Sequence, residues 1–298
     1  MAVKVEMSEF LGHKAVTLSN GNAELIVLTG VGPRIISLSA YGGANHFCVR
    51  RDQLENPAQD AWNIFGGHRL WVSPELAGRS DEPDNVPVQV ELLESGVRVS
   101  CKSDVTLTER AMTVTLDKKA ARVSVVHEIK NLSMFDIELS AWALSVMDAG
   151  GLLAVEQISE DTGLLPNRSL SLWPYSAMND SRVYWGDRFI TLNQDKDAAK
   201  PFKLGMPADK GYAAYFNHGQ LVVKRFEFDP EAIYPDFGCN FEAYTCDFML
   251  ESESLSPLEL LAPGQSVTHV EEWEIFDKVS RPAPRDENAI AAALEGRA

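Results

Sequence analysis

Ala111-Met-Thr-Val-Thr-Leu116 and Arg122-Val-Ser-Val-Val-His-Glu-Ile129, on either side of Asp117-Lys-Lys-Ala120, decide the fold class of this chain. Both runs are rich in β-branched residues, which suit the pleated surface of a strand, where successive side chains point to opposite faces. The short polar stretch between them is typical of a hairpin connection. The segment therefore predicts two antiparallel strands joined by a tight turn.

The same period of two recurs along the chain and outweighs any helical period. It predicts further strands at 23–28, 34–39, 88–93, 96–101, 137–146, 152–157, 188–192, 211–216, 220–228, 241–253 and 268–275, with long loops at 79–87 and 193–208. A helical tail is expected at 282–298, where Asp286 caps a short helix over 287–294. Many closely spaced strands with no strand–helix alternation predict an all-β, antiparallel sandwich or barrel.

Composition limits the classes of function. The chain has 298 residues, of which 45% are hydrophobic and 23% charged, enough for a substantial core, and we expect a single domain over 1–298. Its formal net charge is −16, with no compensating stripe of Lys and Arg. Because nucleic acids and anionic membranes would repel such a surface, neither is an expected partner.

Cysteine usage and hydropathy point to the cytoplasm as the expected location. Four cysteines without any CxxC pair are too sparse for a disulfide scaffold and fit a reducing compartment. The N-terminal residues lack the apolar core of a signal peptide, and no apolar run reaches transmembrane length. The six histidines show no HxH or HExxH spacing, and there is no P-loop or GxSxG motif, so we expect neither a metal nor a cofactor.

The most informative polar segment is Gly66-Gly67-His68-Arg69-Leu70-Trp71-Val72-Ser73-Pro74-Glu75. A planar guanidinium and a flat indole suit a polyhydroxylated ligand, since the first donates to hydroxyls and the second covers a C–H-rich face. A surface loop with one buried Trp explains the segment equally well. If the stretch is extended, His68 and Arg69 point to opposite faces, and both reach one ligand only if the Gly pair allows a bend.

Two acids interrupt a later apolar run. On a strand, Glu251 and Glu253 project from one face, where like charges raise the pKa of at least one carboxyl and tune it as a base. A solvated edge face is the competing interpretation. Asp236 stands in a Pro-Asp-Phe-Gly turn, and turn chemistry explains it about as well as ligand binding does. Glu242 opens the strand that is predicted to run to Glu253.

Three further polar residues have a structural interpretation beside the functional one. Lys203 and Lys224 are isolated cations, and each is more often a solvated lysine than a ligand-binding one. His127 shares a strand face with Val125 and Ile129, which favours a buried, hydrogen-bonded core histidine.

Read together, these segments resemble the galactose mutarotase (aldose 1-epimerase) superfamily, and within it a mutarotase-like branch. The resemblance covers nearly the whole chain in order, at 22–28, 32–36, 44–47, 66–75, 142–151, 234–242, 251–258, 261–264 and 271–273. It implies a large antiparallel β-sandwich, a supersandwich with few short helices, whose concave face holds a small-molecule carbohydrate. It also implies a late glutamate that takes the anomeric proton and a histidine that protonates the ring oxygen.

Carried over residue by residue, the late glutamate matches Glu253 best, with its neighbour Glu251 as the alternative. Arg69 stands where the family has a sugar-binding arginine, and Asp236 is a looser match to an acid that grips ring hydroxyls. The family's mid-chain histidine has no counterpart at 142–147. His68 would have to act as the acid, and without a proton donor ring opening loses about 10² to 10⁴ in rate.

Two main hypotheses follow, beside a third possibility of another lyase or isomerase reaction on the shared scaffold, because fold does not fix function. The first is an aldose 1-epimerase-type isomerase with Glu253 as base and His68 as acid, its site lined by Arg69, Trp71, Glu75, Asp236, Glu242, Glu251, Lys203 and Lys224. The second is a non-catalytic sugar-binding protein that uses the same cleft. A sugar phosphate would need a cluster of cations, and the candidates are few, so a neutral saccharide is the favoured ligand.

Overall fold

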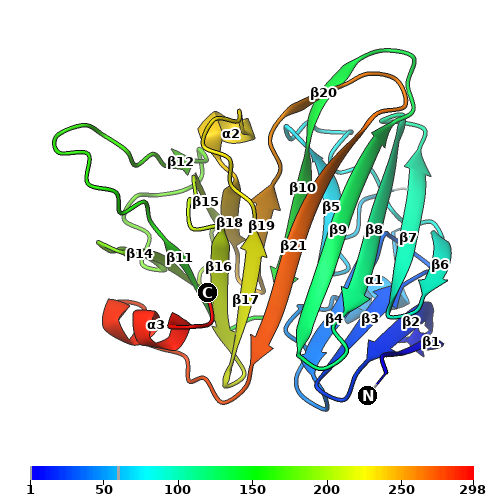
Figure 1. The fold of residues 1–298 in the computed structure, drawn as a ribbon, viewed down its shortest axis with the longest axis horizontal. Helices are drawn as coiled ribbons and strands as arrows, with labels where there is room; N and C mark the ends of the chain where they lie inside the picture. Colours follow the sequence, from blue (N-terminus) through cyan, green and yellow to red (C-terminus); the bar gives the residue numbers. More distant parts are fainter. Residues whose placement is uncertain (1, 59–60) are drawn as a thin grey trace.

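The computed structural model describes residues 2–58 and 61–298, and Met1, Gln59 and Asp60 lie outside the described part. Within these ranges the strands form two antiparallel sheets, of 11 and 10 strands (Figure 1). The strands of the first are β1 (Lys4–Phe10), β2 (His13–Ser19), β3 (Ala23–Leu28), β4 (Arg34–Ala40), β5 (Gly67–Ser73), β10 (Ile137–Met147), β12 (Ser171–Leu172), β15 (Phe202–Met206), β18 (Phe241–Thr245), β19 (Leu250–Leu255) and β20 (Glu259–Leu261).

The first sheet has the order β1-β2-β3-β4-β5-β10-β19-β18-β15-β12, with β20 paired to β10 beside this path. The second has the order β13-β14-β11-β16-β17-β21-β9-β8-β7-β6. Its strands are β6 (Gln89–Leu93), β7 (Gly96–Ser103), β8 (Thr108–Leu116), β9 (Arg122–Asn131), β11 (Leu152–Glu156), β13 (Val183–Trp185), β14 (Phe189–Asn193), β16 (Tyr212–Asn217), β17 (Gln220–Phe226) and β21 (Ser266–Phe276).

The sheets pack face to face around a core of alternate side chains. Along β9 buried residues alternate with partly exposed ones, as expected for a strand with one face on the core. Aromatic pairs span the two sheets, for example Phe226 on β17 stacked on Phe241 of β18 at 5.7 Å between ring centroids. The predicted all-β antiparallel sandwich is confirmed.

Turn chemistry accounts for the hairpin on which the sequence analysis began. The carboxylate of Asp117 accepts hydrogen bonds from the backbone N–H groups of Lys119 and Ala120, at 2.6 and 2.7 Å. These bonds satisfy donors that the strand ladder leaves free. They fix the turn between β8 and β9, which then pair from Thr108 to Asn131.

Helices are short in the described part of the chain: α1 (Arg51–Glu55), α2 (Pro235–Gly238) and α3 (Glu287–Leu294). Asp286 caps α3 as predicted, since its side chain accepts from the N–H of Ala289 at 3.0 Å. Among the described residues, no helix combines the length and apolar character that a bilayer crossing requires.

Two boundaries predicted from the sequence were wrong. The run 241–253 is not one strand but the hairpin β18–β19, because the backbone reverses where Cys246 N–H bonds to the carbonyl of Met249 at 3.1 Å. The stretch 193–208 is not all loop, because it contains β15, which pairs with β18. The hairpin brings Glu242 directly opposite Glu253, and β15 brings Lys203 onto the neighbouring strand.

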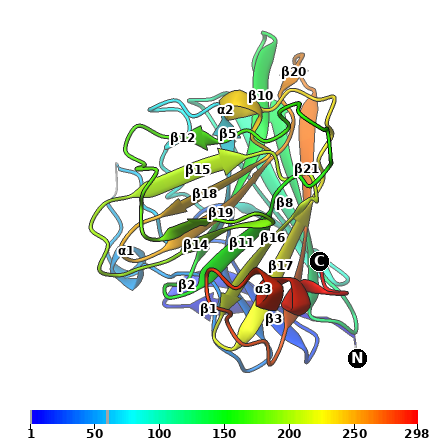
Figure 2. The same ribbon diagram turned by 90° about the vertical axis from the view of Figure 1, so that its left-hand side faces the viewer.

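Three central strands of the first sheet are buried on both faces. Every residue of β5 and β19 is buried, as is nearly every residue of β10. One face of these strands packs on the second sheet. Burial of the opposite, outer face therefore requires loops and side chains that cover it. Figure 2 shows β15, β18 and β19 side by side. Loops and side chains over this outer face enclose the cavity described next.

Candidate functional site

Strand register places the predicted site residues from distant parts of the chain in one row. Arg69 on β5 and Glu253 on β19 both lie opposite Leu144 of β10, and Glu242 of β18 lies opposite Glu253. Directly opposed residues of antiparallel strands project from the same face. Arg69, Glu242 and Glu253 therefore share the outer face of the first sheet.

A cavity of about 630 Å³ lies over this face. Its walls carry flat apolar surfaces and charged groups together. The aromatic residues that line it are Trp62, Trp71, Trp142, Tyr175, Tyr244 and Phe248. The charged residues that line it are Arg50, Arg69, Glu75, Asp81, Lys203, Asp247 and Glu251. A concave, largely aromatic pocket of this size with a few placed polar groups is typical of a small-molecule site.

Arg69 is the best-defined polar group in the cavity. It is only 2% exposed, and its guanidinium lies 4.4 Å from the ring centre of Trp71 and 5.3 Å from that of Trp62. One nitrogen, Nη2, donates to Glu251 Oε1 at 2.9 Å. Nε and Nη1 are buried without a hydrogen-bond partner in the described residues. Unpartnered buried donors are rare and costly, so these N–H groups would be stabilised by an acceptor.

Glu251 faces Arg69 across the cavity floor. Burial raises the pKa of the Glu251 carboxyl above its usual value, and the cation of Arg69 opposes part of that rise. Glu251 is thus a carboxyl at the cavity wall whose proton affinity is increased by its surroundings.

Glu253 and Glu242 are committed to a buried ion cluster around Lys203. The Lys203 Nζ lies 2.7 Å from Glu242 Oε2 and 3.0 Å from Glu253 Oε2. It also lies 4.6 Å from the ring centres of both Trp142 and Trp173. Burial disfavours the charge of Lys203, but the two carboxylates outweigh that effect and raise its pKa. Burial also raises the pKa of Glu242 well above its usual range.

Glu253 is fully buried, and its Oε2 additionally accepts from the indole N–H of Trp142 at 2.8 Å. Of the residues described, neither Glu253 nor Glu242 lines the cavity, whereas Lys203 and Glu251 do. The structure therefore places Glu253 beneath the cavity floor and Glu251 on its wall.

Glu75 and Asp236 lie at the rim. Glu75 lines the main cavity and, together with Asp236, a smaller adjoining one. Partial burial raises the pKa of Glu75, and the carboxylates of Glu253 and Asp236 add to the rise while Lys203 opposes it. Asp236 belongs to α2, where its φ of 51° is left-handed, a conformation that aspartate tolerates better than most residues.

His68 does not reach this cavity. It follows Gly67 and precedes Arg69 on a regular strand, so its side chain points to the other face, between the sheets. The ring is fully buried and lies 4.7 Å from Trp273. Gly66 and Gly67 both have positive φ, at 92° and 73°, but Gly66 precedes β5 and Gly67 is its first paired residue, so the bend comes before His68 and not at it. His68 and Glu253 are not brought to one ligand-sized space.

Instead, His68 belongs to a hydrogen-bonded chain between the sheets. His127 Nδ1 lies 3.0 Å from the carbonyl oxygen of His269, which can only accept, so Nδ1 carries the proton. A neutral His127 then accepts at Nε2 from His68 Nε2, at 2.7 Å. His68 Nδ1 is left to accept from the Ser145 hydroxyl at 2.8 Å, and that oxygen accepts from Lys224 Nζ at 2.8 Å. His127 is thus the buried, hydrogen-bonded histidine that the sequence favours.

Glu271 neutralises this interior chain. Its Oε1 lies 2.8 Å from Lys224 Nζ and accepts from Ser254 Oγ at 2.6 Å, while Oε2 accepts from Trp273 Nε1 at 2.8 Å. Burial alone would raise the pKa of Glu271, but Lys224 together with His68, His127 and His269 outweighs burial and holds that pKa far below its usual value. Lys224 therefore lies with His68, inside the sandwich and away from the cavity.

The atoms of His68, His127 and Glu271 that could bind a metal lie within 4.8 Å of one another. Two imidazole nitrogens bound to one tetrahedral zinc ion, at about 2.0–2.1 Å each, would lie about 3.3 Å apart. The observed 2.7 Å between the two Nε2 atoms fits a shared proton better. Burial lowers the pKa of both histidines, which keeps the rings neutral in this chain of bonds.

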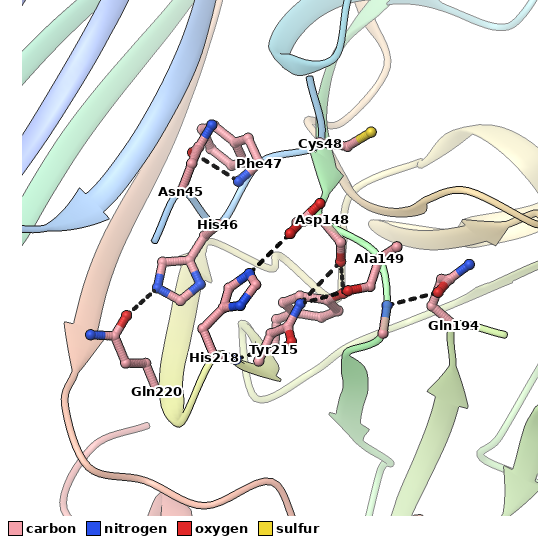
Figure 3. Close-up of polar contacts among 12 residues, drawn as sticks. Asn45, His46, Phe47, Cys48, Asp148, Ala149, Gln194, Tyr215, His218 and Gln220 are labelled. Carbon is pink, nitrogen blue, oxygen red and sulfur yellow. Dashed lines mark hydrogen bonds and ion pairs between the residues drawn. The ribbon is translucent and has the colours of Figure 1, made fainter. Parts of the chain in front are cut away.

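A separate polar cluster, outside the Lys203 ion cluster and the interior hydrogen-bonded chain, connects the end of β10 to the β16–β17 turn (Figure 3). His218 Nε2 lies 3.0 Å from Asp148 Oδ2, and the Tyr215 hydroxyl donates to the Asp148 carbonyl. His46 Nε2 bonds to Gln220 Oε1 at 2.7 Å, and the His46 carbonyl accepts from the N–H of Asp148. The contacts join segments that are far apart in sequence, which gives this cluster a structural role.

Another cavity, of about 740 Å³, lies between α3 and the adjacent ends of β11 and β16, at Glu156 and Tyr212. Its lining is mostly small or ion-paired, including Ala291, Gly296 and the Arg188–Glu156 pair at 2.8 Å. It offers fewer aromatic faces than the cavity over β5, β10 and β19, which is accordingly the candidate functional site.

Several cavity residues were not predicted. Trp62 and Tyr175 line the cavity from loops with no distinguishing motif, and Tyr244 lines it from β18, within the run 241–253 that was predicted as a strand. Trp142 lies on a strand that the sequence does predict, and alternation along 137–146 places it with Leu144 on one face. The same alternation places Tyr244 with Glu242 on one face of β18, whereas the loop positions of Trp62 and Tyr175 depend on the tertiary fold.

No protein-family model and no curated protein matches the sequence. Solved structures do match. A galactose mutarotase-like protein from Clostridium acetobutylicum is 12% identical, with a TM-score of 0.56 over 93% of this chain and 99% of its own. Another from Lactobacillus casei is 11% identical, with a TM-score of 0.54 over 88% of this chain and 100% of its own.

A third match, a protein from Salmonella typhimurium that is provisionally named a mutarotase, is 9% identical with a TM-score of 0.61, covering 92% of this chain and 94% of its own. At such low identity the likeness establishes the fold and not the activity. Residue register, sheet order and these superpositions agree: the chain has the galactose mutarotase-like fold.

Proposed function

We propose that this protein binds a carbohydrate in the cavity over β5, β10 and β19. The observation that carries the proposal is Arg69, which lies against the rings of Trp62 and Trp71 and has two buried N–H groups without a hydrogen-bond acceptor in the described residues. Sugar hydroxyls and ring oxygens are such acceptors, and the C–H faces of a sugar ring pack well on indoles. The fold supports this proposal by analogy, since the matched proteins are named for mutarotase chemistry.

The charge of the cavity favours an uncharged sugar. Each cation on its wall already faces a carboxylate: Arg69 faces Glu251, Lys203 faces Glu242 and Glu253, and Arg50 lies 2.7 Å from Asp52. Phosphate groups in proteins are usually bound by cations that have no competing carboxylate. A phosphorylated sugar would therefore displace existing ion pairs, whereas a neutral sugar would not.

Isomerisation at the anomeric centre is the second candidate function. Glu251 and Glu75 line one cavity, and burial raises the pKa of both carboxyls toward the range where acids and bases work near neutrality. In this scheme Glu251, ionised beside Arg69, takes the proton of the anomeric hydroxyl, and Glu75 gives its proton to the ring oxygen. The C1–O5 bond breaks to an aldehyde, which recloses on either face with the protons returned.

This assignment replaces the pair expected from the sequence, Glu253 and His68, because those side chains lie under the cavity floor and between the sheets respectively. A non-catalytic sugar-binding protein differs from the isomerase only in lacking the exchange step. The two are separated by measurement of binding and exchange on the same samples.

The experiment is a titration with D-glucose, D-galactose, D-mannose and D-xylose, followed by ligand-observed NMR for binding and by saturation exchange between anomers for turnover. We expect Arg69→Gln to weaken binding at least about tenfold, equivalent to about 1.4 kcal/mol. Arg98→Gln, which alters an arginine paired with Glu128 on the other sheet, is the matched control and should bind normally. Absence of binding by all four sugars contradicts the proposal.

For the isomerase, anomer exchange above the buffer rate should fall about 10²-fold or more in Glu251→Gln, while binding persists. Binding without exchange in the unaltered protein selects the non-catalytic alternative.

A further inference from the structure

The candidate cavity has a smaller neighbour. A second cavity of about 390 Å³ adjoins it, and the two share Glu75 and Asp81 as lining residues. The remaining lining of the second cavity comes from the loop after β5 and from two remote residues, Trp173 and Asp236. Because the side chains of Glu75 and Asp81 contact both spaces, the two cavities are direct neighbours.

Each cavity has its own indole, and Lys203 links the two. The Lys203 Nζ lies 4.6 Å from the ring centre of Trp142, which lines the main cavity, and 4.6 Å from that of Trp173, which lines the adjoining one. The same ammonium is fixed by Glu242 and Glu253. Both indoles therefore contact the same buried ion cluster.

Asp236 is held rigidly at the far end of the second cavity. Its left-handed backbone is fixed because its carbonyl accepts from Ser171 Oγ at 2.6 Å and from Cys239 Sγ at 3.1 Å. Cys239 N–H also bonds to Pro235 O at 2.9 Å, which closes the turn. Within the described part of the chain no hydrogen bond engages the Asp236 carboxylate. A carboxylate only accepts, so it can receive hydroxyl or amine donors from a ligand.

We propose that the adjoining cavity is a second subsite, which takes the neighbouring residue of an oligosaccharide whose first residue occupies the main cavity. This rests on the proposed carbohydrate-binding function. Trp173 packs against the second ring and Asp236 accepts hydrogen bonds from its hydroxyls. Three carboxylates and no cation line the subsite among the described residues, so the second residue is neutral or amine-bearing, not phosphorylated or sulfated.

The test compares each disaccharide with its own monosaccharide by calorimetry and NMR. The probes are cellobiose and maltose against glucose, lactose against galactose, and chitobiose (the deacetylated glucosamine dimer) against glucosamine. We expect at least one disaccharide to bind about tenfold more tightly than its monosaccharide. Asp236→Asn should remove most of that gain and leave monosaccharide affinity unchanged, whereas Asp187→Asn, at an exposed aspartate outside both cavities, should change neither.

The outcomes separate the two proposals. If monosaccharides bind and no disaccharide binds more tightly, or if Asp236→Asn weakens both ligands equally, the second subsite is refuted while the proposed function stands. If no sugar of either size binds, both are refuted. Trp173→Ala gives a second check, because it should reduce the disaccharide gain even if the Asp236 variant proves unstable.

Discussion

Replacement of Lys224 by methionine tests the interior polar chain that underlies the site. Lys224 is 3% exposed, and its Nζ contacts Glu271 at 2.8 Å, Ser145 at 2.8 Å and the carbonyl of Ser252 at 3.0 Å. Methionine keeps most of the side-chain volume but removes the charge and the donors. The variant leaves Glu271 buried without its cation.

Removing one partner of a buried ion pair costs about 3–5 kcal/mol, because the remaining charge is uncompensated. Against a typical total stability of about 5–15 kcal/mol, this is a large fraction. Urea unfolding followed by tryptophan fluorescence measures the loss. Lys118→Met, at an exposed lysine paired with Glu94, is the matched control and should leave the unfolding midpoint unchanged.

The pH dependence of the destabilisation and a double variant show whether it is caused by loss of the Lys224–Glu271 ion pair. Without Lys224, burial raises the pKa of Glu271, so the carboxyl takes up a proton and the penalty relative to the unaltered protein shrinks at acidic pH. The double variant Lys224→Met/Glu271→Gln should recover part of the loss. A cost below about 1 kcal/mol for Lys224→Met, or one that does not depend on pH, would refute this account of the interior.

Other predictions concern acid, glycine and thiols. Burial lowers the pKa of His269 to about 3 and of His46 to about 4, so the unfolded chain binds more protons than the folded one below about pH 6.5. The two neutral histidines make their full contribution to the free energy of unfolding above that pH. On acidification the free energy of unfolding should fall by up to about 1.4 kcal/mol per pH unit for each histidine. A free energy of unfolding that stays constant from about pH 6 to about pH 4.5 contradicts this prediction. Gly66→Ala should unfold the protein or greatly lower its Tm in a thermal scan. A Cβ at this position would lie 1.9 Å from the carbonyl oxygen of Cys48, and the φ of 92° is unfavourable for alanine. An unchanged Tm would show that the backbone can move aside and would contradict the prediction. Burial raises the pKa of the Cys48 thiol to about 12 and also raises that of Cys246, so both should resist alkylation at pH 8 until denaturant is added, and rapid native-state labelling would count against their burial.

Most of the fold followed from alternation and turns. The β8–β9 hairpin, the Asp286 cap and the sandwich class are all local or periodic signals, and each was predicted correctly. The break between β18 and β19 was missed because Asp247 and Phe248 interrupt an apolar run without Gly or Pro. The strand β15 was missed because it is short and its burial depends on neighbours that are remote in the sequence.

The candidate site was predictable only in part. Strand parity places Arg69, Glu251 and Glu253 on one face once the strands are known, and the same parity removes His68 from it. Parity does not show depth, so it could not reveal that Glu253 lies under Lys203 and Trp142 while Glu251 reaches the cavity. Loop residues such as Trp62 and Tyr175 meet the sheet only through tertiary folding.

The central claim, that the cavity around Arg69 is where a sugar binds, is tested most directly by the six tryptophan indole N–H resonances in ¹⁵N-labelled protein. Saturable shifts of Trp62, Trp71 and Trp142 on addition of an aldose, with Trp185 and Trp273 unmoved, are the result we predict. Shifts confined to Trp185 or Trp273, or no shift with any aldose, would contradict it.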